Sequence, residues 1–225
     1  MRRFLVLGLM MASVVGCKST AEGGEGAPKG PASAPGSVMP LSDSTEAPPP
    51  PAGLAVATFA GGCFWCMEPP FEKVDGVQAV YSGYTGGPER NPTYKQVSHG
   101  GTGHTESVRV IYDPKVVSYD KLLDTFWRSM DPTDAGGQFV DRGSQYRPAI
   151  FVHDEAQRAA AEKSKAALQA SGRFSAPIIV PIVDAGPFWL AEDYHQDFYK
   201  KSPDHYHGYR AGSGRDQFLK KVWDK

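Results

Sequence analysis

Residues 54–66 read LAVATFAGGCFWC, and this stretch decides how the fold begins. Its first part, 54–60, is apolar except for one threonine, which is typical of a buried strand. Gly61 and Gly62 then turn the chain into a segment in which Cys63 and Cys66 enclose two aromatic residues. Where such a pair opens a helix after a strand, the helix N-terminus stabilises a thiolate. The stretch therefore predicts a strand, a glycine turn and a reactive thiol.

Outward from this stretch, apolar patterns predict further elements. Further strands are expected at 77–84, 106–113, 148–153 and 178–183. Helices are expected over 118–130, capped by Ser118, and over 154–171, ended by Gly172. Strands and helices alternate irregularly, and two strands follow one another directly after the first helix. This favours an α+β fold, a ferredoxin-like split βαβ sheet with helices on one side, over a doubly wound sheet.

The N-terminal part predicts export and a tether. Residues 1–16 begin with a charged pair, continue with a short apolar run and end before Cys17, which resembles a bacterial lipoprotein signal. A plain export signal is the alternative. Residues 17–52 are rich in Gly, Pro, Ala and Ser, so we expect a lipidated, disordered linker before one domain at 53–225. The expected location is the bacterial cell envelope, with a lipid anchor in a membrane on the periplasmic or extracytoplasmic side.

Composition and cysteine spacing exclude several classes. The formal net charge is −1 and no basic stripe is visible, so no nucleic-acid partner is expected. No second cysteine pair accompanies Cys63 and Cys66, so no metal site is expected. A purely structural disulfide between them would close a very small loop and contribute little. A thiol–disulfide oxidoreductase stays open, although the bulky Phe64 and Trp65 favour a pocket for an apolar group.

Several separate motifs then point to one family. They are GGCFWCMEPPFEKVDGV at 61–77, YSGYTGG at 81–87, NPTYKQVSHGGTGHTESVRVIYDP at 91–114 and QFVDRGSQYRPAIF at 138–151. In this order they resemble the peptide methionine sulfoxide reductases of the A type. The resemblance covers nearly all of 54–209 and implies an enzyme of oxidative damage repair.

The resemblance implies a role for each catalytic residue. Cys63 matches the nucleophile that attacks the sulfoxide sulfur, releases methionine and is left as a sulfenic acid. Glu106 matches the acid that protonates the sulfoxide oxygen, and Tyr94 and Tyr146 match two phenols that hold it. Asp141 matches a carboxylate near the site that supports the arrangement of these catalytic residues. Physical chemistry agrees, because a carboxylic acid supplies a proton at neutral pH only if burial raises its pKa.

Substrate contacts follow from the same resemblance. Phe64 and Trp65 match the pair that receives the substrate methyl group, and the family implies the S epimer of methionine sulfoxide, free or in oxidised proteins. His104 shares a strand face with Glu106, where it tunes the site or packs. His195 is interpreted as structural.

The chain differs from many relatives in the cysteines that could reduce the oxidised nucleophile again. Those relatives carry further cysteines near the C-terminus. This tail has none, so Cys66 is expected to resolve the sulfenic acid by forming a disulfide with Cys63. A thioredoxin-like protein or a small dithiol would reduce it, without a bound cofactor. The alternative is a one-cysteine enzyme with Cys66 as filler. Pro69 and Pro70 remove backbone donors and are expected to end the helix early. We expect a monomer.

Overall fold

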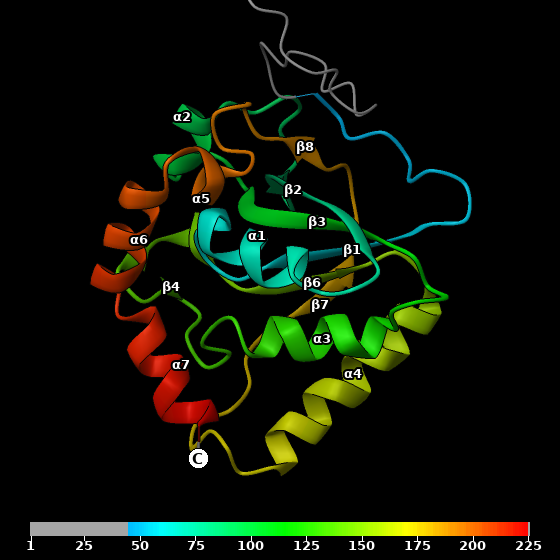
Figure 1. Cartoon of the computed structure of the whole chain (residues 1–225), viewed down its shortest axis with the longest axis vertical. Coiled ribbons are helices and arrows are strands. Elements are labelled where there is room, and N and C mark those ends of the chain that lie inside the picture. Colours follow the sequence, from blue (N-terminus) through cyan, green and yellow to red (C-terminus); the bar gives the residue numbers. More distant parts are fainter. Residues whose placement is uncertain (1–44, 225) are drawn as a thin grey trace, which may run out of the picture. The chain divides into compact units, whose positions relative to one another are not determined.

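The computed structural model describes residues 45–224, and Cys17 with the predicted signal lies outside them. A six-stranded sheet forms the centre, in the order β7-β6-β1-β3-β2-β8 (Figure 1). Its strands are β1 (Ala55–Ala60), β2 (Val77–Thr85), β3 (Thr105–Tyr112), β6 (Ala149–Val152), β7 (Ile182–Asp184) and β8 (Trp189–Leu190). The helices are α1 (Phe64–Glu72), α2 (Tyr94–Ser98), α3 (Tyr119–Trp127), α4 (Glu155–Ala170), α5 (Phe198–Lys201), α6 (Pro203–Gly212) and α7 (Arg215–Trp223). A short pair, β4 (Gly137–Gln138) and β5 (Asp141–Arg142), follows α3.

The strand pairing confirms the predicted α+β sheet. β3 pairs antiparallel with both β1 and β2, so β1 and β2 run parallel with β3 between them, and α1 connects the two. In the same way β1 lies between β3 and β6, and α3 is the helix of that connection. Each of these two units is split by a strand of the other, which a doubly wound sheet does not do.

Aromatic stacking shows which face the first helices cover. Phe59 of β1 stacks on Phe71 of α1 and on Phe126 of α3, with ring centroids 5.1 Å apart in both pairs. All three side chains are fully buried. α1 and α3 therefore share the face of the sheet toward which Phe59 points. Ser118 caps α3 as predicted, because its hydroxyl accepts the backbone N–H of Lys121.

Packing begins before the predicted domain boundary. In the segment 45–50, the N–H of Ala47 donates to the carbonyl of Phe188 at 2.8 Å. The buried guanidinium of Arg109, on β3, donates to the carbonyls of Ala47 and Pro48. The expectation of an unpacked linker is wrong for this segment. Backbone groups make these contacts, and a hydrophobicity pattern does not detect them.

The predicted strand at 178–183 is shorter and shifted. β7 contains only Ile182–Asp184 and runs parallel to β6. Pro181 has no N–H to give to a ladder, and its carbonyl accepts the N–H of Ile150. Ile179 donates its N–H to the carbonyl of Pro132 instead of to a strand.

No helix in the described part of the chain is long and apolar enough to span a membrane.

The expectation that prolines end the first helix early is wrong. α1 continues through Pro69 and Pro70 to its end at Glu72. Pro70 cannot donate to the carbonyl of Cys66, which lies one helical turn earlier. That carbonyl accepts a hydrogen bond from Nη1 of Arg210, at 3.2 Å. A side chain from the C-terminal helices thus replaces a missing backbone donor.

Candidate active site

The turn before α1 sets the position of Cys63. Gly62 has a φ of +88°, and a Cβ there would lie 2.5 Å from the Cβ of Gln138, so the turn requires glycine. Cys63 is the N-cap residue of α1, and its carbonyl accepts the N–H of Cys66 at 3.0 Å. Cys63 is only 6 % exposed. The predicted nucleophile therefore lies at a helix N-terminus in a nearly closed site.

The carboxyl of Glu106 lies beside this turn. Glu106 is on β3, directly opposite Tyr84 of β2, and its Oε2 accepts the backbone N–H of Phe64 at 3.1 Å. It is 2 % exposed. Burial raises the pKa of Glu106 to about 8, more than the hydrogen bond from Phe64 lowers it, and the negative charge of Asp141 adds to the rise. At neutral pH this carboxyl is a neutral acid next to the Cys63 thiol.

Two phenols face the same space. Tyr94 begins α2, whose start is held where the N–H of Tyr94 donates to Glu192 at 2.8 Å. Tyr146 ends a 3₁₀ turn that follows β5. Burial raises the pKa of Tyr94 to about 12 and also raises the pKa of Tyr146. Glu106 and Cys63 lie close enough to both phenols to act on them electrostatically when ionised, so the predicted residues are brought together.

Asp141 has a partner that the sequence did not suggest. The hydroxyl of Tyr209, on α6, donates to Oδ2 of Asp141. Burial raises the pKa of Asp141, and the bond from Tyr209 opposes that rise. The Tyr209 hydroxyl is also close enough to hydrogen-bond to Cys63. No motif singled out Tyr209; its only signal is that the family resemblance extends to about this residue.

The two aromatic residues of the motif pack differently. Phe64 is fully buried, and its ring tilts against Tyr84 and His195. Trp65 is half-buried and stacks on Phe198 with ring centroids 3.7 Å apart. Both residues lie in the first turn of α1, between Cys63 and Cys66. Their expected role toward the substrate methyl group stays a prediction.

His195 and His104, the two histidines considered in the sequence analysis, make different contacts. Nδ1 of His195 accepts the indole N–H of Trp65 at 3.0 Å, and burial lowers the pKa of His195 to about 4, so the ring is neutral. His195 therefore orients Trp65. His104 accepts the N–H of Gly87 on Nδ1 and bonds through Nε2 to the carbonyl of Glu89 at 2.7 Å. His104 is a packing residue of the 87–89 loop.

The two thiols lie beside each other at the start of α1. Both cysteines are buried and free, and their sulfur atoms are close enough to share a hydrogen bond. This bond lowers the pKa of Cys66 to about 7, helped by the charges of Arg215 and Arg210 and opposed by burial. Burial, the same hydrogen bond and the charge of Glu106 raise the pKa of Cys63. The first ionisation therefore belongs to the pair, and these contacts favour the negative charge on Cys66.

Potential metal ligands gather elsewhere. Within residues 45–224, the group close enough to share an ion comprises Glu68, Glu72 and Asp197. Glu72 already pairs with Nζ of Lys200 at 2.7 Å and accepts the hydroxyl of Tyr199. This group contains no cysteine of the site. The described site, with two adjacent thiols, a neutral acid and phenols, defines a thiol-dependent oxidoreductase.

Comparison with known proteins identifies the family. The model of the family "Peptide methionine sulfoxide reductase" matches residues 55–225. The peptide methionine sulfoxide reductase MsrA of Listeria innocua serovar 6a is 58 % identical over 170 residues, which are 76 % of this chain and 96 % of that protein. The MsrA of Ligilactobacillus salivarius is 57 % identical over 168 residues, covering 75 % and 97 %.

Comparison with solved structures points to the same family. Mxr1 from Saccharomyces cerevisiae in its reduced form is similar with a TM-score of 0.65 and 32 % identity, covering 74 % of this chain and 93 % of that one. Methionine sulfoxide reductase A of Corynebacterium diphtheriae follows with a TM-score of 0.58 and 30 % identity, covering 73 % and 91 %. The chain belongs to the peptide methionine sulfoxide reductase family, A type. The prediction of an enzyme that reduces methionine sulfoxide with thiols is confirmed.

Proposed function

We propose that the chain reduces the S epimer of methionine sulfoxide, free or in oxidised proteins, through a sulfenic acid on Cys63. The observation that supports this most is the buried carboxyl of Glu106, whose Oε2 lies 3.1 Å from the backbone nitrogen of Phe64. A sulfoxide oxygen leaves only as it gains a proton, so an acid is needed beside the nucleophile. Disulfide exchange, the alternative activity, needs no such acid. Membership of the A type supports the S epimer.

The first step uses the protons that the site holds. The Cys66 thiolate takes the proton of Cys63, and the Cys63 thiolate attacks the sulfoxide sulfur. This attack forms a sulfur–sulfur bond while the sulfoxide oxygen takes the proton of Glu106. The hydroxyl then passes from the substrate sulfur to Cys63, so the substrate sulfur–oxygen bond and the sulfur–sulfur bond break as a sulfur–oxygen bond to Cys63 forms. Methionine leaves, and Cys63 is a sulfenic acid. Tyr94 and Tyr146 keep their protons and donate to the oxygen as its negative charge grows.

The second step removes the oxygen. Cys66 loses its proton and attacks the sulfur of Cys63, a disulfide forms, and the oxygen leaves with a proton as water. A thioredoxin-like protein or a small dithiol then reduces the disulfide, and one dithiol is oxidised for each methionine formed. The shared hydrogen bond of the two sulfur atoms supports this assignment. In the alternative, an external thiol reduces the sulfenic acid directly and Cys66 is filler.

The location is proposed from the sequence of the first 52 residues. The apolar run that ends at Cys17 supports a lipid anchor on the extracytoplasmic side of the bacterial envelope. Cys17→Ala should move the protein from the membrane fraction to the soluble fraction, as an immunoblot of the two fractions would show. Equal membrane recovery of both forms would contradict the anchor.

The function is tested by single-turnover reduction of each epimer of dabsyl-methionine sulfoxide to dabsyl-methionine, the methionine product that is measured. The wild-type chain should release methionine from the S epimer, Cys63→Ser should release none, and Glu106→Gln should be slower by about a hundredfold or more. Glu68→Gln is the matched control, because burial also raises the pKa of Glu68 to about 8 while its carboxyl binds Ser82 and Asp197. A Glu106→Gln chain with normal methionine release and intact disulfide exchange would favour the alternative activity.

The resolving role of Cys66 has its own test. Cys66→Ser should release one equivalent of methionine, more slowly, and then resist recycling by thioredoxin. After one equivalent of sulfoxide, mass spectrometry should show the wild-type chain lighter by two hydrogens and the variant heavier by one oxygen. Normal recycling of the variant would support the one-cysteine cycle.

A further inference from the structure

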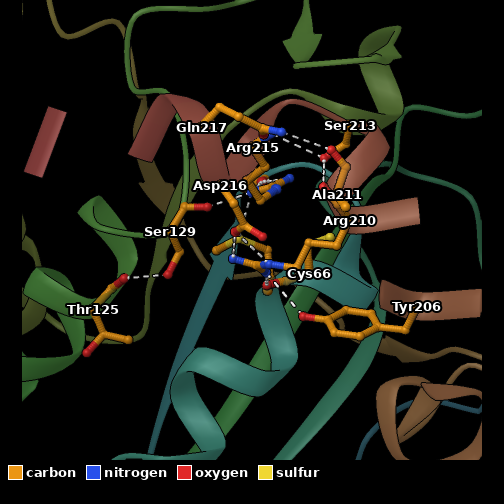
Figure 2. Close-up of polar contacts among 12 residues, drawn as sticks. Cys66, Thr125, Ser129, Tyr206, Arg210, Ala211, Ser213, Arg215, Asp216 and Gln217 are labelled. Atoms are coloured by element: carbon orange, nitrogen blue, oxygen red, sulfur yellow. Dashed lines mark hydrogen bonds and ion pairs between the residues drawn. The ribbon is translucent and has the colours of Figure 1, made fainter. Parts of the chain in front are cut away.

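Arg210 of α6 reaches the first turn of α1 beside Cys66 (Figure 2). Its Nη1 donates to the carbonyl of Cys66 and to the hydroxyl of Tyr206, each at 3.2 Å. Oδ1 of Asp216 accepts from its Nε at 2.8 Å and lies 2.7 Å from its Nη2. The Cys66 carbonyl is available because Pro70 has no N–H. Arg210 is therefore fixed at one end by a carboxylate and at the other by the backbone of the cysteine.

A second guanidinium lies near the same turn. Arg215 is 1 % exposed, and its Nη1 donates to the carbonyl of Ser129 at 2.5 Å and to the carbonyl of Gly61 at 3.2 Å. Its charge also lies over the ring of Phe139, 4.7 Å from the centroid. Arg215 supports the turn from inside the core. Arg210 keeps 18 % of its side chain exposed, so its replacement disturbs the core less than replacement of Arg215 would.

We propose that Arg210 is a positioning residue for the resolving step: it holds the backbone at Cys66 and stabilises the Cys66 thiolate. The proposal rests on the resolving role that the proposed function gives to Cys66. The α6–α7 segment carries no cysteine, and through Arg210 it prepares a thiol that α1 supplies. Its contribution to recycling is then a positive charge and a hydrogen bond instead of a sulfur atom.

The charged and titratable groups around Cys66 also support a stabilising role for Arg210. The groups that act on it are Cys63 at the start of α1, Glu106 of β3, Asp141 of β5, Tyr206 and Arg210 of α6, and Arg215 of α7. The hydrogen bond from Cys63 is the largest cause that lowers the pKa of Cys66, followed by Arg215 and Arg210. Burial and Asp141 oppose them. Loss of the Arg210 charge should therefore move the ionisation of Cys66 to higher pH.

The first experiment measures that ionisation in the full chain without substrate. In a Cys63→Ser background, whose hydroxyl keeps a donor beside Cys66, iodoacetamide labelling of the Cys66 peptide is followed by mass spectrometry across pH. Arg210→Gln should raise the midpoint by about one pH unit and slow labelling near pH 7 by about fivefold. Arg210→Lys should recover most of the rate. The matched control is Arg158→Gln, since Arg158 pairs with Asp184 on another surface. An unchanged midpoint in Arg210→Gln would overturn the proposal.

The second experiment follows the resolving step with both cysteines present. After one equivalent of sulfoxide, dimedone should trap several times more Cys63 sulfenic acid in Arg210→Gln than in wild type. Equal trapping would overturn the role of Arg210 in this step. If the wild-type chain forms no disulfide between Cys63 and Cys66, the resolving role itself fails. The labelling midpoint, read without substrate, still decides whether Arg210 stabilises the thiolate.

Discussion

The rate of methionine release should have a narrow, bell-shaped dependence on pH. The hydrogen bond from Cys63 lowers the pKa of Cys66 to about 7, while burial raises the pKa of Glu106 to about 8. The first step needs the thiol pair to have lost one proton and Glu106 to keep its own. The rate should therefore rise as the pair ionises and fall as Glu106 loses its proton.

The size of the effect follows from these two values. The fraction of enzyme in the required form peaks at about 60 % near pH 7.5 and falls to about 10 % near pH 6 and near pH 9. Each limb thus lowers the single-turnover rate by about sixfold over 1.5 pH units. An ordinary carboxyl, with its pKa near 4.5, would leave no catalytic acid in this range.

The assay is rapid-quench measurement of dabsyl-methionine formed from dabsyl-methionine-S-sulfoxide, with enzyme in excess so that recycling does not contribute. Glu106→Gln should lose the alkaline limb together with most of the rate, whereas Glu68→Gln should keep both limbs. Cys66→Ser should move the acid limb to higher pH, because burial raises the pKa of Cys63, which must then ionise alone. An alkaline limb that persists in Glu106→Gln would refute the assignment of this carboxyl as the acid.

Three further predictions concern stability and are read from urea unfolding of the full chain. Phe59→Ala should lower the free energy of unfolding by about 3–5 kcal/mol, because its buried ring stacks on both Phe71 and Phe126; a loss below about 1 kcal/mol would contradict this packing. Ser118→Ala should lower it by about 1 kcal/mol through the lost cap of α3, whereas Ser118→Asp should restore it. Burial raises the pKa of Glu68 from 4.5 to about 8, so its contribution is full below about pH 4.5 and is lost as the pH rises to about 8. Glu68→Gln should flatten this decline, and an unchanged slope would contradict it.

Side-chain periodicity was sufficient for the elements that bury apolar faces. Phe59 on a strand and Phe126 on a helix lie where their patterns place them, and they meet in the core. The segment 45–50 was missed because its contacts run from Ala47 through the backbone and from the side chain of Arg109. The extent of β7 was misjudged because a proline within an apolar run removes a ladder donor without changing hydrophobicity.

Some residues of the candidate site could likewise be predicted from the sequence, and others could not. Cys63, Glu106 and Tyr94 belong to motifs with a stated chemistry, so their juxtaposition could be predicted and the structure brings them together. Tyr209 and Arg210 lie in a polar tail without periodicity or motif. Their contacts with Asp141 and Cys66 span 68 and 144 residues of sequence, a relation that only the folded chain reveals.

The distribution of protons between the two thiols has a chemical consequence. Cys63 is buried and shares a hydrogen bond with Cys66, so a second negative charge there is unfavourable and the nucleophile rests as a thiol. Oxidants react with thiolates far more readily than with thiols, so the resting nucleophile resists attack. Substrate changes the balance, because its oxygen accepts the proton of Glu106 while Cys66 accepts that of Cys63. The guanidinium of Arg210 that stabilises the resting Cys66 thiolate then favours its return for the second step.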